Sequence, residues 1–258
     1  MTVSFSLENH VARICIDRPD RMNAVDDATW DALEDIWQKI EADNDVRVVI
    51  LTGSGEKAFC AGADMKGGNA LSGLEYWENA RSGGFGGLAL RKSLHVPVIA
   101  RVNGLAVGGG FELVLGCDIV VAAEHASFGL PEARVGRMPL DGGMIALPRM
   151  IPQKVAMGML MTGNRISAQE AERYGLVNQV VPADELDDAV DAWVADILKC
   201  APLSVKAIKE SVKETIDMPV DEAMAKRLPS LVAALESEDA DEGPLAFREK
   251  REPNWKGR

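Results

Sequence analysis

Two glutamates stand where a charged side chain is unusual. Glu112 follows three consecutive glycines in NGLAVGGGFELVLG and is flanked by apolar residues, and Glu132 follows Gly and Pro in SFGLPEARVG. Two carboxylates close to one pocket titrate separately and can divide the roles of general acid and general base. The spacing leaves open whether the two meet. Each could instead be a solvated residue or a residue that stabilises a helix end.

The glycines in front of Glu112 predict a site for an anion or an oxyanion. Consecutive glycines at a helix start leave backbone N–H groups unshielded, and the helix dipole favours negative charge there. A second loop of small residues, AFCAGADMK at 58–66, would let backbone N–H groups approach a ligand closely, with Asp64 as a helix cap. The alternative for the three glycines is a tight turn that needs glycine only for its dihedral angles, and the alternative for 58–66 is a simple loop with a helix cap.

Composition limits the possible functions. The chain has 258 residues and a net charge of -12, which argues against nucleic acid as a partner. The first residues lack the features of a secretory signal, and no apolar run is long enough to cross a membrane. Four cysteines lie far apart with no CxxC pair, and the three histidines show no metal spacing. We therefore expect a cytoplasmic protein with no metal site and no membrane segment.

The elements that must position these residues belong to an α/β protein. A hairpin is predicted over 3–17, an amphipathic helix over 26–43 with Asp26 or Asp27 as its cap, and buried strands over 46–53, 97–104 and 118–124. Between the first two of these strands we expect a polar loop, 53–73, and a helix after it. Further on, helices are predicted over 153–161, 167–173, 183–199, 202–216 and 220–237. The chain thus divides into a core, 1–190, and a helical C-terminal lobe, 191–258.

Four segments together resemble the enoyl-CoA hydratase (crotonase) superfamily, in order and at compatible spacing over nearly the whole chain. They are AFCAGADMK, PVIARVNGLAVGGGFELVLGCDIVVAAEHASFGLPEARVG, MTGNRISAQEAERYGLVNQVVP and SEDADEGPLAFREKREPNWKGR. The resemblance implies a crotonase-like spiral of ββα turns with a helical trimerisation lobe, assembled as a homotrimer or homohexamer. It also implies an acyl-CoA thioester substrate and no separate cofactor, because coenzyme A is part of that substrate.

The resemblance also implies roles for particular residues. The backbone N–H groups of Ala63 and Gly109 would form the oxyanion hole for the thioester carbonyl. Glu132 would transfer the proton at the α-carbon, and Glu112 would activate the water added at the β-carbon. Coenzyme A would lie along two loops, through Arg21, Met22, Ala24, Ala61, Asp64, Met65 and Lys66.

Both glutamates together favour a hydratase or dehydratase, a carbon–oxygen lyase, over an enoyl-CoA isomerase that uses Glu132 alone as a proton shuttle. A non-catalytic acyl-CoA-binding member of the family is a further alternative. One departure concerns the acyl pocket: MPLDGG places Leu140 where many hydratases have a glycine, followed by Asp141, which is either an extra acid or a simple turn residue.

Within the family, SGGFGGLAL and the aspartate near the paired glycines at 142–143 resemble the carnitinyl-CoA dehydratase (crotonobetainyl-CoA hydratase) branch. In that branch the aspartate stands one position away. A trimethylammonium group on the substrate would call for aromatic faces around it, with Tyr76, Trp77 and Phe85 as candidates. The alternative is that these three rings only pack between helices.

Overall fold

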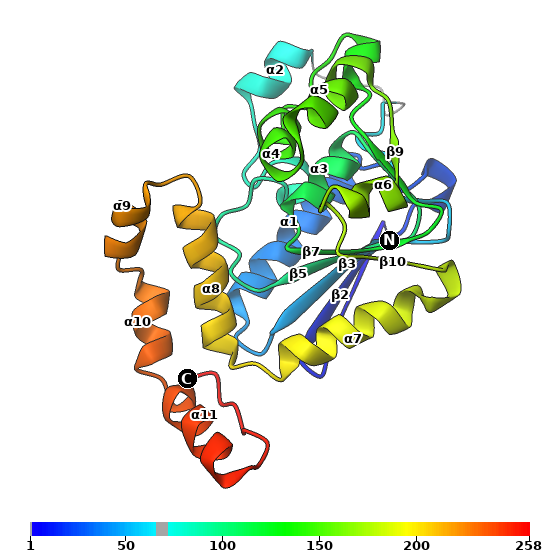
Figure 1. Cartoon of the computed structure of the whole chain (residues 1–258). Coiled ribbons are helices and arrows are strands. Elements are labelled where there is room, and N and C mark those ends of the chain that lie inside the picture. The colour runs from blue at the N-terminus through cyan, green and yellow to red at the C-terminus, as the bar shows by residue number, and fades with distance from the viewer. Residues whose placement is uncertain (1, 66–71) are drawn as a thin grey trace.

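The computed structural model describes residues 2–65 and 72–258, and its base is a sheet in the order β1-β2-β3-β5-β7-β10 (Figure 1). β1 and β2 are antiparallel, whereas the other neighbouring pairs are parallel. The strands are β1 (Val3–Glu8), β2 (Val11–Ile16), β3 (Val48–Gly53), β5 (Val98–Val102), β7 (Ile119–Ala123) and β10 (Gln179–Val181). This sheet confirms the predicted hairpin and the three predicted buried strands.

The hairpin turns at two residues with left-handed backbone. Asn9 has φ 49° and His10 has φ 70°, and in a two-residue hairpin such a turn follows the right-handed twist of the strands. β2 then lies parallel to β3, in register from Val11 opposite Val48 to Ile16 opposite Gly53.

Helices cover both faces of the middle of this sheet, which explains why β3, β5 and β7 are nearly continuous in apolar residues. Successive side chains point to opposite faces. Accordingly, Val49 and Leu51 join the core that includes Trp37 of α1 (Asp27–Ala42), whereas Val48 and Ile50 join the core under α7 (Leu186–Leu198). The predicted cap of α1 is confirmed, because the Asp26 side chain accepts a hydrogen bond from the Thr29 N–H at 2.9 Å.

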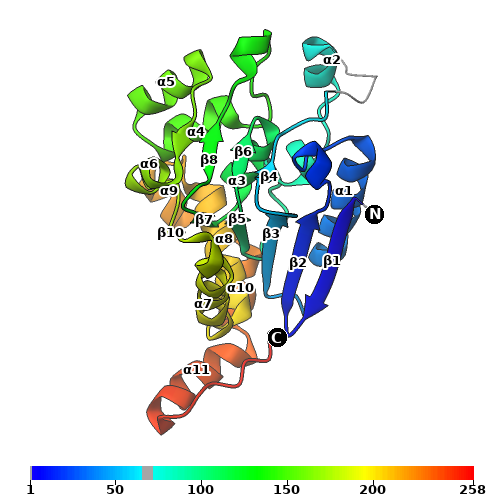
Figure 2. The ribbon, with the colours of Figure 1, turned by 90° about the vertical axis from the view of Figure 1, so that its right-hand side faces the viewer.

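A second, smaller sheet has the order β4-β6-β8-β9 (Figure 2). Its strands are β4 (Ala58–Cys60), β6 (Leu105–Val107), β8 (Ser127–Gly129) and β9 (Ile166–Ser167). β4 follows β3, β6 follows β5 and β8 follows β7 along the chain. The chain therefore passes from the large sheet to the small sheet three times, once in each turn of a spiral. This is the spiral that the resemblance implied. The sequence analysis had placed β4 inside a loop.

The remaining helices are α2 (Gly73–Glu78), α3 (Gly109–Gly116), α4 (Gly143–Met150), α5 (Gln153–Thr162), α6 (Ala168–Arg173), α8 (Pro202–Thr215), α9 (Val220–Ala225), α10 (Pro229–Leu235) and α11 (Glu238–Glu249). The single helix expected over 220–237 is wrong. Lys226 and Leu228 are extended and Pro229 starts a new helix, because the residue before a proline is disfavoured in helical conformation.

Of the C-terminal helices, α8 lies alongside the body of the protein, where Lys209 bonds Val96 and Asp118, and α11 lies farthest from the sheets (Figure 1). The expected boundary at residue 190 falls within α7, which packs on the large sheet. The division into a core and a C-terminal lobe stays a prediction. Within the described ranges, none of the helices is both long and apolar enough to cross a bilayer.

Candidate active site

Three loops of the candidate site leave the same edge of the small sheet. β4, β6 and β8 are parallel, so their carboxyl ends lie together, where ligands of parallel sheets are commonly bound. Ala63 follows β4, Gly109 follows β6, and Glu132 follows β8. The topology thus brings together three residues that are distant in the sequence.

The N–H groups of Ala63 and Gly109 are available to a ligand. Val25 donates to the Gly62 carbonyl and accepts from the Asp64 N–H, both at 2.9 Å, and this parallel bridge directs the Ala63 N–H away from Val25. Gly109 is the first residue of α3, where an N–H has no partner within the helix. Neither N–H takes part in a hydrogen bond within residues 2–65 and 72–258.

Each of the three glycines allows a close approach. Gly108 has φ 58°, a conformation that glycine adopts readily. A Cβ at Gly109 would lie 2.4 Å from the Phe85 ring, and a Cβ at Gly110 would lie 2.0 Å from the Cys60 carbonyl oxygen. The glycines therefore serve both the turn and the packing of α3 on β4, and the bare N–H of Gly109 results from the same arrangement.

Glu112 is buried on α3, with 3% of its surface exposed. Its Oε1 accepts a hydrogen bond from the Gly143 N–H at 2.8 Å, and the carboxylate also accepts from the Asp141 N–H. Burial raises the pKa of Glu112 to about 8, and the nearby charges of Asp141 and Glu132 act in the same direction. A carboxyl group with this pKa exchanges a proton readily near neutral pH.

Glu132 begins a single 3-10 turn, Glu132–Val135. Its Oε1 lies 3.3 Å from where a Cβ on Gly108 would be, so this carboxyl group faces the glycine turn. Its Oε2 is buried and has no hydrogen-bond partner within the described part of the chain. Burial raises its pKa as well. An unsatisfied buried oxygen is costly and is a frequent feature of functional sites. The structure thus brings Glu112, Glu132, Gly109 and Ala63 together.

A third carboxylate, Asp141, lies beside Glu112. It is 7% exposed and accepts hydrogen bonds from the Tyr76 hydroxyl and from the backbone N–H of Phe85, so it is not a solvated turn residue. Leu140 beside it is half-buried. The aromatic candidates differ: Phe85 is buried edge-on against Trp30, Tyr76 is half-buried, and Trp77 is 63% exposed.

The two loops expected to hold coenzyme A lie side by side. The Ala61 N–H donates to the Met22 carbonyl at 3.0 Å, next to the bridge between Val25 and Ala63. Arg21 and Met65 are exposed, Met22 is half-buried and Ala24 is buried. Lys66 lies outside the described residues.

The sequence analysis missed Arg18, which joins the two loops. Its guanidinium pairs with Asp26 at 2.8 Å and with Asp64 at 2.9 Å, and it donates to the Ala24 carbonyl. Asp64 therefore contributes to loop structure through an ion pair. The only signal for Arg18 in the sequence was its place at the start of the RPDR turn, where Arg21 was chosen instead.

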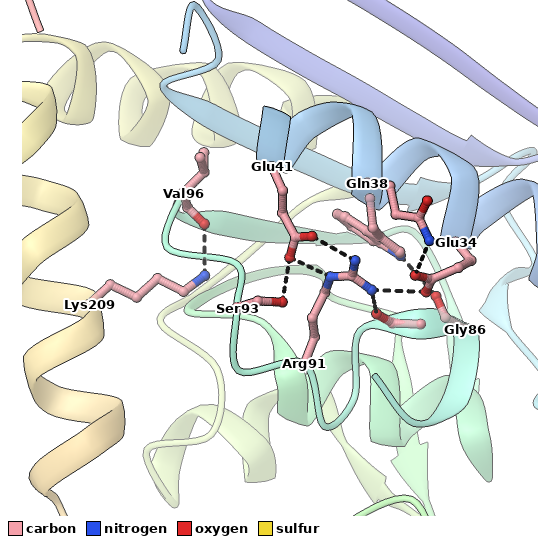
Figure 3. Close-up of polar contacts among 10 residues, drawn as sticks. Glu34, Gln38, Glu41, Gly86, Arg91, Ser93, Val96 and Lys209 are labelled. Carbon is pink, nitrogen blue, oxygen red and sulfur yellow. Dashed lines mark hydrogen bonds and ion pairs between the residues drawn. The ribbon is translucent and has the colours of Figure 1, made fainter. Parts of the chain in front are cut away.

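Arg91 holds the segment that carries Phe85 against α1 (Figure 3). Its side chain is 6% exposed and pairs with Glu41 at 2.7 Å and with Glu34 at 2.9 Å, while it also donates to the Gly87 carbonyl. Lys209 of α8 fastens the far end of the segment by donating to the Val96 carbonyl at 2.7 Å. These bonds fix the Phe85 ring under Gly109. They also fix the Phe85 N–H, which donates a hydrogen bond to Asp141.

Comparison with known proteins identifies the family of the chain. The family model described as enoyl-CoA hydratase/isomerase matches residues 6–258. Carnitinyl-CoA dehydratases of Salmonella enteritidis PT4 and Salmonella arizonae are each 45% identical to the chain, over 96% of this chain and 95% of theirs.

Two solved structures are similar over their full lengths. The enoyl-CoA hydratase of Bacillus anthracis has a TM-score of 0.91 at 36% identity, with 100% of each chain covered. That of Mycobacterium tuberculosis has a TM-score of 0.89 at 34% identity, with 100% of this chain and 99% of the other covered. By sequence over nearly its whole length, and by fold, the chain belongs to the enoyl-CoA hydratase/isomerase family.

Proposed function

We propose that this enzyme adds water reversibly across the α,β double bond of an enoyl-CoA thioester. The observation that carries the proposal is the placement of two carboxyl groups, buried Glu112 and half-buried Glu132, beside two N–H groups that form no hydrogen bond within the described part of the chain. The family supports the same reaction class, and such an enzyme is a carbon–oxygen lyase.

In the proposed mechanism the thioester oxygen accepts hydrogen bonds from the N–H groups of Ala63 and Gly109. These donors stabilise the enolate more than the ground-state carbonyl, because the negative charge grows on that oxygen. Glu112 takes a proton from water as the oxygen bonds to the β-carbon, and Glu132 delivers a proton to the α-carbon. In the reverse direction each group performs the opposite transfer.

Coenzyme A would lie along the paired loops that contain Arg21, Met22, Ala24, Ala61, Asp64, Met65 and Lys66. The exposed guanidinium of Arg21 suits a phosphate of the nucleotide end. The pairing of Arg18 with Asp64 keeps the two loops together. Half-buried Leu140 would border the acyl chain near Glu112.

The main alternative is isomerisation of an enoyl-CoA by Glu132 alone. The two backbone donors on Glu112 and its raised pKa favour hydration, since an isomerase that uses one shuttle has no need of a second poised carboxyl group. The test is loss of enoyl-thioester absorbance with crotonyl-CoA, run beside conversion of but-3-enoyl-CoA. Hydration faster than isomerisation supports the proposal, and isomerisation without hydration would overturn it.

The acyl group of the natural substrate is proposed from the relatives. Carnitinyl-CoA dehydratases at 45% identity support a γ-trimethylammonium acyl chain, with dehydration of carnitinyl-CoA or hydration of crotonobetainyl-CoA as the reaction. A wild-type enzyme that hydrates crotonyl-CoA but leaves crotonobetainyl-CoA unchanged would refute this choice of substrate and leave the reaction class intact.

We further propose a homotrimer or a pair of trimers. Apolar side chains on α8 and α10 are exposed, among them Ile208, Val212 and Leu235, and a second copy would cover them. Sedimentation equilibrium measures the assembly directly. A cytoplasmic location likewise stays a prediction.

A further inference from the structure

Asp141 is a buried carboxylate that forms no ion pair within the described part of the chain. Its hydrogen bonds come from neutral donors, the Tyr76 hydroxyl and the Phe85 N–H. Within residues 2–65 and 72–258, no lysine, arginine or histidine forms an ion pair with Asp141, Glu112 or Glu132. Buried charges in proteins are normally paired, so three carboxyl groups this close together make ionisation of each one costly.

The neighbouring carboxylates act on the pKa of Glu112. Asp141 and Glu132 both raise the pKa of Glu112, and burial raises the pKa of Asp141 itself. A ligand that brings positive charge would relieve this repulsion, whereas a neutral acyl chain would add to the burial of the same carboxylates.

Asp141 lies at the acyl end of the site. Its backbone N–H donates to Glu112, whose proposed role is at the β-carbon, and its side chain bonds Tyr76. Burial and the charge of Asp141 raise the pKa of Tyr76, and the charge of Glu112 adds to this, so the hydroxyl lies near both carboxyl groups. In a substrate whose β-carbon lies at Glu112, a substituent on the γ-carbon is two bonds away and would be within reach of Asp141 and Tyr76, which adjoin Glu112.

The surroundings suit a cation that cannot donate hydrogen bonds. Tyr76 and Phe85 both lie edge-on to Trp30, with ring centroids 6.4 Å and 5.1 Å from it, and the Arg81 guanidinium lies over the Trp30 ring at 5.1 Å from its centroid. This group of rings therefore already accepts one cation, and Tyr76 links it to Asp141. Quaternary ammonium groups are recognised by aromatic faces and by the field of a carboxylate, because they offer no N–H for a directed bond.

We propose that Asp141, held by Tyr76 and by the Phe85 N–H, is the counter-ion of a quaternary ammonium group on the γ-carbon of the acyl chain. The proposal rests on the hydratase function above and names the residue that selects the cationic substrate. Asp141 is a specificity residue here, and the proton transfers stay with Glu112 and Glu132.

The test compares two substrates of the same shape. In 5,5-dimethylhex-2-enoyl-CoA a carbon atom replaces the nitrogen of crotonobetainyl-CoA, which removes the charge and keeps the three methyl groups. We expect wild type to have the higher kcat/KM on the cationic compound. Asp141→Asn should lower kcat/KM about 30-fold more on the cationic compound than on the neutral one, equivalent to ~2 kcal/mol. The matched variant Asp141→Glu keeps the charge and should retain part of the preference.

Equal losses on the two substrates in Asp141→Asn would overturn the proposal and show that Asp141 acts through Glu112 or through the fold. Ligand binding to the wild-type protein gives a second measurement, which does not depend on the folding of a variant. Titration calorimetry with saturated 4-trimethylammoniobutyryl-CoA and with 5,5-dimethylhexanoyl-CoA should show tighter binding of the cation, and equal affinities would sink the idea. Activity of the wild type on crotonyl-CoA separates failure of this proposal from failure of the proposed function. A wild-type enzyme that hydrates no enoyl-CoA contradicts the proposed function itself.

Discussion

The N-terminus of α3 gives a sharp test of the oxyanion hole, because Gly109 has no room for a side chain. A Cβ added there would lie 2.4 Å from two carbons of the Phe85 ring. Carbon atoms in contact prefer about 3.5–4.0 Å, so the ring or the helix start must shift by roughly 1 Å. Phe85 is 3% exposed and its own segment is held by Arg91, so the start of the helix must take up part of this shift.

Displacement of the Gly109 N–H by this amount should be costly for catalysis. A misplacement of about 1 Å in a reacting geometry can cost about 100-fold in rate. We therefore expect Gly109→Ala to lower kcat for crotonyl-CoA hydration about 100-fold, while circular dichroism and the cooperative unfolding transition remain.

The matched control is Gly158→Ala. Gly158 is exposed within α5, and a Cβ there meets nothing within 4 Å. This variant should keep full activity and gain roughly 0.5–1 kcal/mol of stability, as alanine does within helices. A Gly109→Ala enzyme with wild-type kcat would refute the assignment of this N–H to the oxyanion hole.

Three further predictions concern the charges around the site. The kcat/KM for hydration should pass through a maximum with pH, because the mechanism needs Glu112 ionised, with its pKa of about 8, and Glu132 protonated, and Asp141→Asn should move the limb that belongs to Glu112 to lower pH; a flat profile from pH 6 to 9 would count against it. Arg91→Met should lower the free energy of urea unfolding by about 3 kcal/mol, since Glu34 and Glu41 lose their buried partner; a loss below about 1 kcal/mol would show that these ion pairs contribute little to stability. Arg21→Ala should raise KM about tenfold for crotonyl-CoA, with a much smaller change for crotonyl-pantetheine, which lacks the nucleotide phosphates; equal changes would remove Arg21 from the nucleotide site.

Local patterns predicted the large elements well. Asp26 as a cap and the apolar face of α1 follow from side-chain chemistry within a few residues, and the resemblance to the hydratase family is confirmed by the family match. The small sheet could not be predicted in this way, because strands of two or three residues, such as β9, have no periodicity to detect. α11 was also missed.

The catalytic residues of the candidate site were predictable from the sequence, but the contacts between its residues were not. Glu112 and Glu132 were recognisable from their unusual neighbours and from the family. The pairing of Arg18 with Asp64, and that of Tyr76 with Asp141 65 residues away, depend on tertiary contacts that no local pattern encodes. For the same reason Asp141 could be taken for a turn residue.

The central claim is that Glu132 acts at the α-carbon and Glu112 at the water, and isotope exchange separates the two roles. The measurement follows uptake of deuterium at the α-carbon of butyryl-CoA in heavy water, beside crotonyl-CoA hydration, for Glu112→Gln and Glu132→Gln. The account predicts that Glu132→Gln loses both reactions by about 100-fold or more, whereas Glu112→Gln loses hydration and keeps most of the exchange. Exchange that survives in Glu132→Gln and disappears in Glu112→Gln would contradict it.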